Sequence, residues 1–239
     1  MRDVVFFFWP LVTRLGELQV LLPAVLLAVL SLALRRETRR MAVTWLALVA
    51  GAVALTLASK LAFMGWGLGW SRMNFTGVSG HAMLAAALLP VLLVALVPTG
   101  SSLARGCALG LGAALALLVG ASRMALGAHS PSEVVAGLVL GGVVTALVLT
   151  TSRRAAGQPQ RAWVLPVAAL VAVGLWLTLS PAYAPRVDTH GLVTQLSLQL
   201  SGRSTPWSRA DMLRERRRDN KTLPVPDQSA RQRLQQASS

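Results

Sequence analysis

Six long apolar stretches, separated by short polar links, occupy most of the first three quarters of the chain. A helix that crosses a bilayer core needs about 20 mostly apolar residues. The segments that approach this length are Leu18–Leu34, Met41–Phe63, His81–Val97, Leu103–Ala121, Glu133–Thr151 and Ala162–Tyr183. The pattern predicts an all-α fold, a polytopic membrane helix bundle of about six transmembrane helices.

The two ends of the chain have a different character. Val4–Val12 is too short to span and is interrupted by Pro10, so we expect an interfacial helix that continues to Glu17. It has no strongly basic leader and no clear cleavage site, which argues against a cleaved signal peptide. The C-terminal tail is rich in Gln, Ser, Arg and Pro and is expected to be flexible, with Leu192–Leu200 as a candidate amphipathic element. The predicted parts are an N-terminal segment 1–17, a membrane domain 18–183 and a basic tail 184–239.

Composition supports the membrane class. Hydrophobic residues make up 54% of the chain and charged residues only 13%, whereas a soluble domain has about a quarter charged residues. The net charge of +14 raises the question of nucleic acid, but ten of the 23 Lys and Arg residues follow Pro185 and most others lie between apolar runs. We therefore expect no nucleic-acid partner.

The distribution of cations predicts a topology. Cytoplasmic links carry an excess of Lys and Arg, and the first, third and fifth links together hold eight: Arg35, Arg36, Arg39, Arg40, Arg105, Arg153, Arg154 and Arg161. The second and fourth links hold only Arg72 and Arg123. We expect a multi-pass protein of the cell (inner) membrane whose second and fourth links face the extracytoplasmic side.

Cysteine and glycine positions add smaller expectations. Cys107 is the only cysteine, which leaves no disulfide framework, and its apolar surroundings favour a buried, inert thiol. Gly106/Gly110 and Gly137/Gly141 have the four-residue spacing of close helix contacts. Packing within one chain is favoured over a dimer face, and the oligomeric state stays open.

Candidate chemistry is concentrated in the two outward links. Between Thr38 and Val187 the only acidic residue is Glu133, and the only histidines are His81 and His129. Ionisable groups at membrane depth are costly and are retained mostly where they act. Two imidazoles can act as nucleophile and proton donor, and Glu133, one helical turn after His129, can fix the tautomer of its ring.

The same links offer groups that bind anions. Arg123 and Arg72 carry planar donors that suit phosphate, and Ser79-Gly80-His81 opens the third span with free backbone N–H groups. Together with the histidines this is an inventory for phosphoryl transfer. No cluster has metal-ligand spacing, so we expect neither a metal nor a cofactor.

These motifs resemble those of a known family. Ser122-Arg123, five residues, His129, three residues and an acid resembles the signature Ser-Arg-x5-His-x3-Asp of the type 2 phosphatidic acid phosphatase (PAP2) superfamily. Ser79-Gly80-His81 is similar to the end of its Pro-Ser-Gly-His signature. The resemblance covers roughly residues 41–151, with the signature region at 60–133.

The resemblance implies a PAP2-like core and a lipid phosphatase that works through a phosphohistidine. It implies His129 as nucleophile and His81 as the acid that protonates the leaving group. Arg123, Ser79 and the Gly80 amide would hold the phosphoryl oxygens, and Glu133 would orient His129. Implied substrates are an isoprenyl pyrophosphate, phosphatidic acid, phosphatidylglycerol phosphate or lipid A.

The sequence departs from the family pattern at three places. Val78 replaces the usual Pro, and Glu133 replaces Asp. The first signature, Lys-x6-Arg-Pro, is not found as such, and Lys60 and Arg72 are its only candidates for binding substrate phosphate.

Two other functions remain open at this stage. The string Gly77-Val78-Ser79-Gly80, with His129 as a base, is similar to the serine motif of rhomboid-type intramembrane proteases. The degenerate first signature would also suit a catalytically inactive lipid-binding or transport protein.

Overall fold

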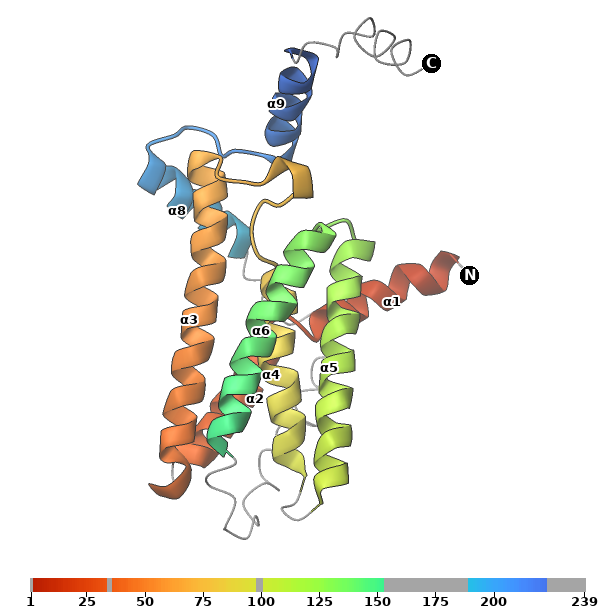
Figure 1. Ribbon diagram of the computed structural model, residues 1–239, viewed down its shortest axis with the longest axis vertical. Helices are drawn as coiled ribbons and strands as arrows, with labels where there is room; N and C mark the ends of the chain where they lie inside the picture. Colours follow the sequence, from red (N-terminus) through yellow and green to blue (C-terminus); the bar gives the residue numbers. More distant parts are fainter. Residues whose placement is uncertain (1, 34–35, 98–100, 153–188, 223–239) are drawn as a thin grey trace, which may run out of the picture.

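The computed structural model describes residues 2–33, 36–97, 101–152 and 189–222 (Figure 1). Nearly all of these residues are helical, which confirms the all-α prediction. The elements are α1 (Arg2–Arg14), α2 (Leu18–Ala33), α3 (Arg36–Trp66), the short 3-10 helix η1 (Ser71–Met73), α4 (Gly80–Leu96), α5 (Ser102–Ala125), α6 (Pro131–Ser152), α8 (Thr189–Ser201) and α9 (Arg209–Thr222).

Helix α4 forms the centre of a bundle. It packs against both α5 and α6, and α3 packs against α6 and α2 (Figure 1). Ala82, Ala85 and Ala87 of α4 are fully buried, as expected for a helix that is apolar all round and enclosed by its neighbours. α3, α5 and α6 instead leave large apolar side chains exposed on their outer faces, such as Leu55, Leu117 and Val139.

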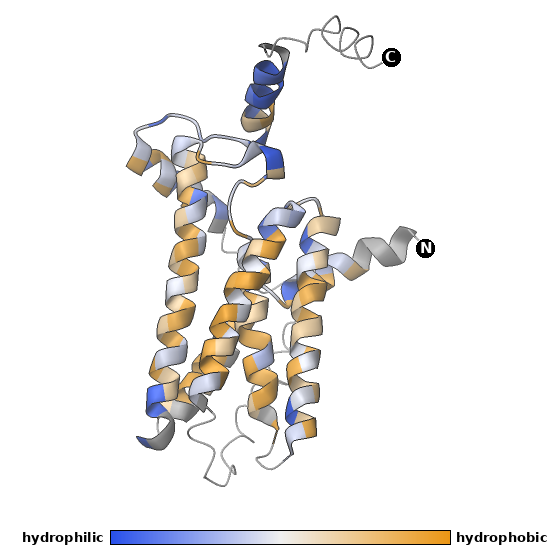
Figure 2. Cartoon of the chain, in the orientation of Figure 1, coloured by the Kyte–Doolittle hydropathy of each residue, from blue (hydrophilic) through white to orange (hydrophobic). Residues whose placement is uncertain are grey.

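This outer apolar surface is that of a membrane protein. Three of the described helices are long and apolar enough to cross a bilayer, over Arg39–Trp66, Ser102–Ala125 and Pro131–Thr151, and α4 contributes a shorter apolar helix, Gly80–Ala95. Figure 2 shows apolar residues along these helices and hydrophilic ones at their ends and on α9. Five predicted spans correspond to α2–α6, and the sixth, Ala162–Tyr183, lies outside the described residues.

Glycines set the closest helix contact in the bundle. A Cβ atom added at Gly137 would lie 2.5 Å from the Ser79 carbonyl oxygen, and one at Gly141 would overlap the Met83 carbonyl oxygen. These two glycines therefore let α6 approach α4 within one chain, as the sequence favoured. Gly106 and Gly110 have no such neighbour among the described residues.

The two ends of the chain flank the bundle. Helix α1 packs on α5, α8 packs on α3, and α9 contacts η1 (Figure 1). The tail, for which composition predicted flexibility, thus contains two helices, and Leu192–Leu200 lies within α8. The expectation that Cys107 is buried was wrong, because its side chain on α5 is exposed.

Candidate active site

The loop between α3 and α4 is held in place by α3. Trp70 and Phe75 form an antiparallel bridge, and Gly77 has a φ of 143°, a conformation that side chains rarely adopt. A Cβ atom at Gly77 would lie 3.1 Å from Lys60 Cγ, so the loop runs directly against this lysine. Only glycine combines this backbone conformation with so close an approach.

Val78 has a physical reason to depart from proline. Its backbone N–H donates to Ser59 Oγ at 3.0 Å, and proline has no N–H to donate. This hydrogen bond ties the loop to α3 immediately before Ser79.

Ser79 connects the two signatures and leaves its hydroxyl unused. Its backbone N–H donates to the carbonyl oxygen of Glu133 at 3.1 Å. Ser79 occupies the N-cap position of α4, yet its side chain makes no cap hydrogen bond, although serine usually caps there. The Oγ is buried and has no partner among the described residues. A helix start with a free hydroxyl and free N–H groups is a favourable place for an anion.

Gly80 leaves room beside that helix start. Among the described residues, a Cβ atom at Gly80 would meet only Thr56 Cγ2, at 3.7 Å. The backbone at Gly80 is therefore not crowded by the described side chains.

His129 and Glu133 form the closest polar contact between two predicted residues. His129 Nδ1 lies 2.7 Å from Glu133 Oε2, and His129 lies in the loop just before α6, whose first residue is Pro131. The side chain of Glu133 is fully buried, while that of His129 is 15% exposed. An ionised Glu133 places the proton on Nδ1, which leaves the Nε2 lone pair free for attack.

Glu133 accepts hydrogen bonds on both carboxylate oxygens. Oε1 accepts from the backbone N–H and the hydroxyl of Thr76, at 2.7 and 2.6 Å. Oε2 accepts from the backbone N–H of Ser130 at 3.0 Å. Arg209 Nη2 donates to both oxygens, at 2.7 and 2.8 Å. A buried carboxylate is tolerated where it is paired and hydrogen-bonded in this way.

Arg123 is positioned by the N-terminal helix. Its Nη1 donates to Thr13 Oγ1 at 2.9 Å, and Glu17 is near enough to act on it electrostatically. Its Nε is buried and has no partner among the described residues. One edge of the guanidinium is thus fixed by α1, and the other keeps a donor available.

His81 lies among basic side chains. Arg123, Lys60 and His129 all act on it electrostatically, so the structure brings Lys60 of α3 into the same cluster. Arg72 differs, because its side chain is exposed on η1 and no hydrogen bond or ion pair within the described ranges joins it to this cluster.

Sequence reasoning missed Thr13, Thr76 and Arg209 as members of the site. Thr76 lies three residues before Ser79, inside the same link, so its neighbourhood was a signal. Thr13 and Arg209 lie 110 and 76 residues from their partners, and no local pattern marks them.

Comparisons with known proteins agree with the geometry. The chain matches the PAP2 superfamily over residues 63–156. A Klebsiella pneumoniae protein described as an uncharacterized 22.5 kDa protein in cps region is 39% identical over 206 residues, which cover 85% of this chain and 97% of that protein. No solved structure matches the chain.

The fold and the site define a membrane-embedded helical protein with a phosphatase-type centre. The chain belongs to the PAP2 superfamily, which confirms the resemblance of its signatures.

Proposed function

We propose that this protein is a lipid phosphatase that hydrolyses a phosphomonoester or pyrophosphate of an amphiphilic substrate through a phosphohistidine at His129. One observation carries the proposal. The imidazole of His129 is held by a buried Glu133, while two buried donors, Ser79 Oγ and Arg123 Nε, lack partners among the described residues. Buried polar atoms are normally paired. Trp45 Nε1, Thr56 Oγ1 and Asn74 Oδ1 also lack partners among the described residues, but Ser79 and Arg123 belong to the two signatures, so we propose these two as donors to a bound phosphate.

The proposed reaction has two displacements. In the first, His129 Nε2 attacks phosphorus, the bond to the leaving oxygen breaks, and His81 gives that oxygen a proton. In the second, water attacks phosphorus, the N–P bond breaks, and the proton of the water passes to His81. Glu133 stabilises the positive imidazole that forms in the first displacement.

Bound substrate would help His81 to carry its proton, because the phosphate offsets the charge of the cations around this ring. Lys60 and Arg123 act on the His81 ring and oppose a positive charge there. A phosphate bound to Lys60, Arg123, Ser79 and the Gly80 amide would offset their charge and favour the protonated, acidic form of His81. Arg72, exposed on η1, is proposed only to attract the anionic headgroup.

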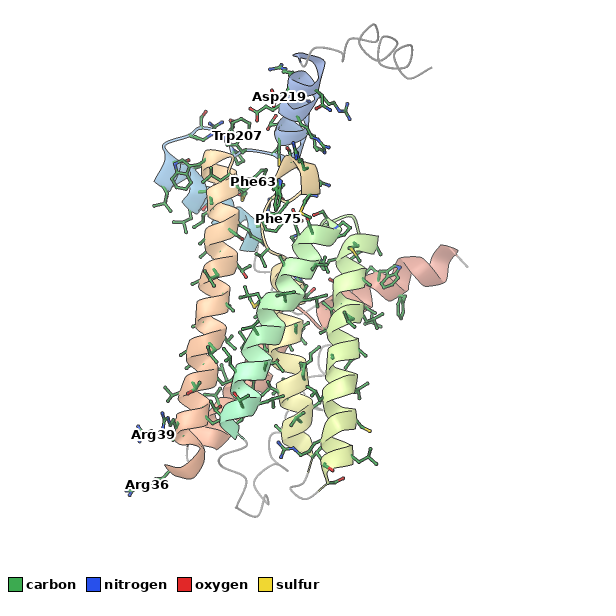
Figure 3. The ribbon with its side chains drawn as sticks, viewed as in Figure 1. Arg36, Arg39, Phe63, Phe75, Trp207 and Asp219 are labelled. Carbon is green, nitrogen blue, oxygen red and sulfur yellow. The ribbon has the colours of Figure 1, made fainter. Side chains whose placement is uncertain are left out.

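The position of the centre favours a lipid substrate. Phe75, in the loop that contributes Thr76 to the site, lies away from the end that carries Arg36 and Arg39 (Figure 3). We propose that the site faces the extracytoplasmic side of the inner membrane. There an isoprenyl pyrophosphate, phosphatidic acid, phosphatidylglycerol phosphate or lipid A can present its phosphate while its chains remain in the bilayer.

Phosphate release from these four lipids by the purified protein in detergent tests the proposal. We expect release from at least one of them, insensitive to EDTA because the charge is stabilised by Lys, Arg and backbone donors, and lost in His129→Ala. The Gly142→Ala variant, whose added methyl group meets none of the described residues, serves as the matched control for expression and folding. Failure on all four lipids would leave the inactive lipid-binding protein as the better account.

A further inference from the structure

Arg209 reaches the centre from a part of the chain that lies outside both signature motifs. It begins α9, 76 residues after Glu133, and its Nη2 bonds both carboxylate oxygens. The same nitrogen lies 3.2 Å from Thr76 Oγ1, and Nη1 lies 3.4 Å from the carbonyl oxygen of Asn74. Glu133 is thus held between His129 on one side and a cation from the tail on the other.

The start of α9 is built to fix the backbone of Arg209. Ser208 and Asp211 form a reciprocal cap, in which the Ser208 N–H donates to Asp211 Oδ2 at 3.1 Å and the Asp211 N–H donates to Ser208 Oγ at 3.2 Å. The hydroxyl and amide of Ser208 lower the pKa of Asp211, which keeps the capping carboxylate charged. Arg209 is the first helical residue after this cap.

The segment that carries Arg209 is docked on α3 by contacts that do not involve Glu133. The Trp207 N–H donates to the carbonyl oxygen of Met64 at 2.9 Å, and Met212 packs with Phe63 and Met64. The Trp207 ring leaves no room for a larger residue at Gly67, where a Cβ atom would lie 3.0 Å from it. Figure 3 shows Trp207, Phe63 and Phe75 gathered at this end of the molecule.

The hydrogen bonds of Arg209 define what it can do. Nη2 has two hydrogens, and three oxygens of Glu133 and Thr76 already compete for them. This nitrogen therefore has no donor left for substrate phosphate. Its charge balances a carboxylate that has no exposure to solvent, and one of the two oxygens that it bonds, Oε2, is the oxygen in contact with His129 Nδ1.

We infer that Arg209 is a positioning residue, which acts on the reaction by holding Glu133 against His129, so that the C-terminal tail completes the active site. The catalytic part of this inference rests on the proposed function. Glu133 is one methylene longer than the Asp of the family signature, and in this protein its carboxylate is bonded by an arginine from the tail.

Kinetics of Arg209 variants test the role. Arg209→Ala should lower kcat on the lipid substrate about 10–100-fold, the usual effect of losing a group that orients a catalytic ligand, with KM unchanged. Arg209→Lys should retain part of the activity, and added methylguanidinium should restore part of it to Arg209→Ala. Arg214→Ala removes the same charge from the same helix at a 75% exposed position with a 3.7 Å pair, and it should behave as the wild type.

Two kinetic results would overturn the inference. One is an Arg209→Ala variant as active as Arg214→Ala. The other is a raised KM with kcat retained, which would make Arg209 a substrate-binding residue instead.

Thermal unfolding in detergent tests the contact without any assay of activity. Arg209→Ala should lower Tm more than Arg214→Ala, because it strands a buried carboxylate. Adding Glu133→Gln to Arg209→Ala should raise Tm again, since a neutral amide is less costly to bury. Additive effects would contradict the pairing. Coupled effects in a protein that releases no phosphate from any lipid would instead refute the proposed function and its catalytic part, while leaving the pair established.

Discussion

Polar atoms of the centre fall into two groups: those with hydrogen-bond partners in the described part of the protein and those without. Glu133 and Thr76 have partners supplied by the protein itself. Ser79 Oγ and Arg123 Nε are buried without partners among the described residues. An unpartnered buried group costs stability, so we interpret the second group as donors retained for a bound phosphate.

Replacement of Ser79 separates the two effects in one experiment. Removing an N-cap side chain normally costs about 0.5–2 kcal/mol, but Ser79 makes no cap bond. We therefore expect Ser79→Ala to leave Tm unchanged or to raise it slightly, because a buried unpartnered hydroxyl is removed, while kcat falls about 10²–10³-fold, as for other single donors to a developing anion. A clear loss of Tm with full activity would show that the hydroxyl is structural.

At the residue scale, contacts between residues close together in the sequence could be predicted, and contacts between distant residues could not. The His129–Glu133 contact was predicted from a spacing of four residues on an expected helix. The contact is present, although His129 lies in the loop before α6 and not on the helix itself. The departure at Val78 was visible, but its reason, the hydrogen bond to Ser59, needed the fold of the loop. Arg209 and Thr13 reach the centre only through tertiary packing, so no spacing announces them.

At the scale of elements, the contact between α4 and α6 determines how the two signatures meet. Ser79 precedes α4 and Glu133 lies in the first turn of α6. Gly137 and Gly141 allow the two helices to touch along their length. The backbone hydrogen bond from Ser79 to Glu133 is a direct result of this approach.

Adjacent glycines of α6 provide a matched test of that contact. Gly141→Ala should destabilise the protein by about 1–3 kcal/mol, the cost of overpacking a close contact, and should lower activity by separating α4 from α6. Gly142→Ala, on the open side of the helix, should be neutral or stabilising by up to about 1 kcal/mol. Thermal unfolding of both variants in detergent gives the comparison, and equal Tm values would mean that α6 does not approach α4 so closely.

The helices that could be predicted from the sequence are those marked by a long apolar run. The apolar runs of α3 to α6 are long enough to be read directly, because the bilayer requires that length. Part of α8, Leu192–Leu200, was predicted as a candidate amphipathic element. Helix α9 was not predicted, since its composition is polar and its order comes from docking on α3 and from the Ser208–Asp211 cap. Composition shows how much apolar surface a segment can bury, but it does not show the tertiary contacts and caps that order a polar helix.

At the scale of the whole molecule, the cations next to the spans indicate which end of the bundle faces the cytoplasm. Figure 3 shows Arg36 and Arg39 at one end of α3, with Phe63 and Phe75 towards the other; Phe75 directly precedes Thr76, which bonds Glu133 of the centre. Arg and Lys residues next to the spans are expected on the cytoplasmic side, so the end with Arg36 and Arg39 would be cytoplasmic and the centre would face outward.

Cysteine labelling tests this orientation. In a Cys107→Ser background, a cysteine replacing Leu68, which is 69% exposed, should react with an impermeant maleimide in intact cells. A cysteine replacing the exposed Arg36 should react only after permeabilisation. The reverse pattern would place the centre in the cytoplasm.

The most direct test of the central claim is to locate the phosphate on the enzyme. His81→Ala should still be phosphorylated by p-nitrophenyl phosphate, whose leaving group needs little protonation, but water attack on the intermediate should be slow because its base is missing. After an alkaline quench, mass spectrometry of the peptide around residue 129 should find phosphate on His129, and His81→Ala/His129→Ala should carry none. Phosphate on Ser79, or wild-type lipid phosphatase activity that persists in His129→Ala, would contradict the account.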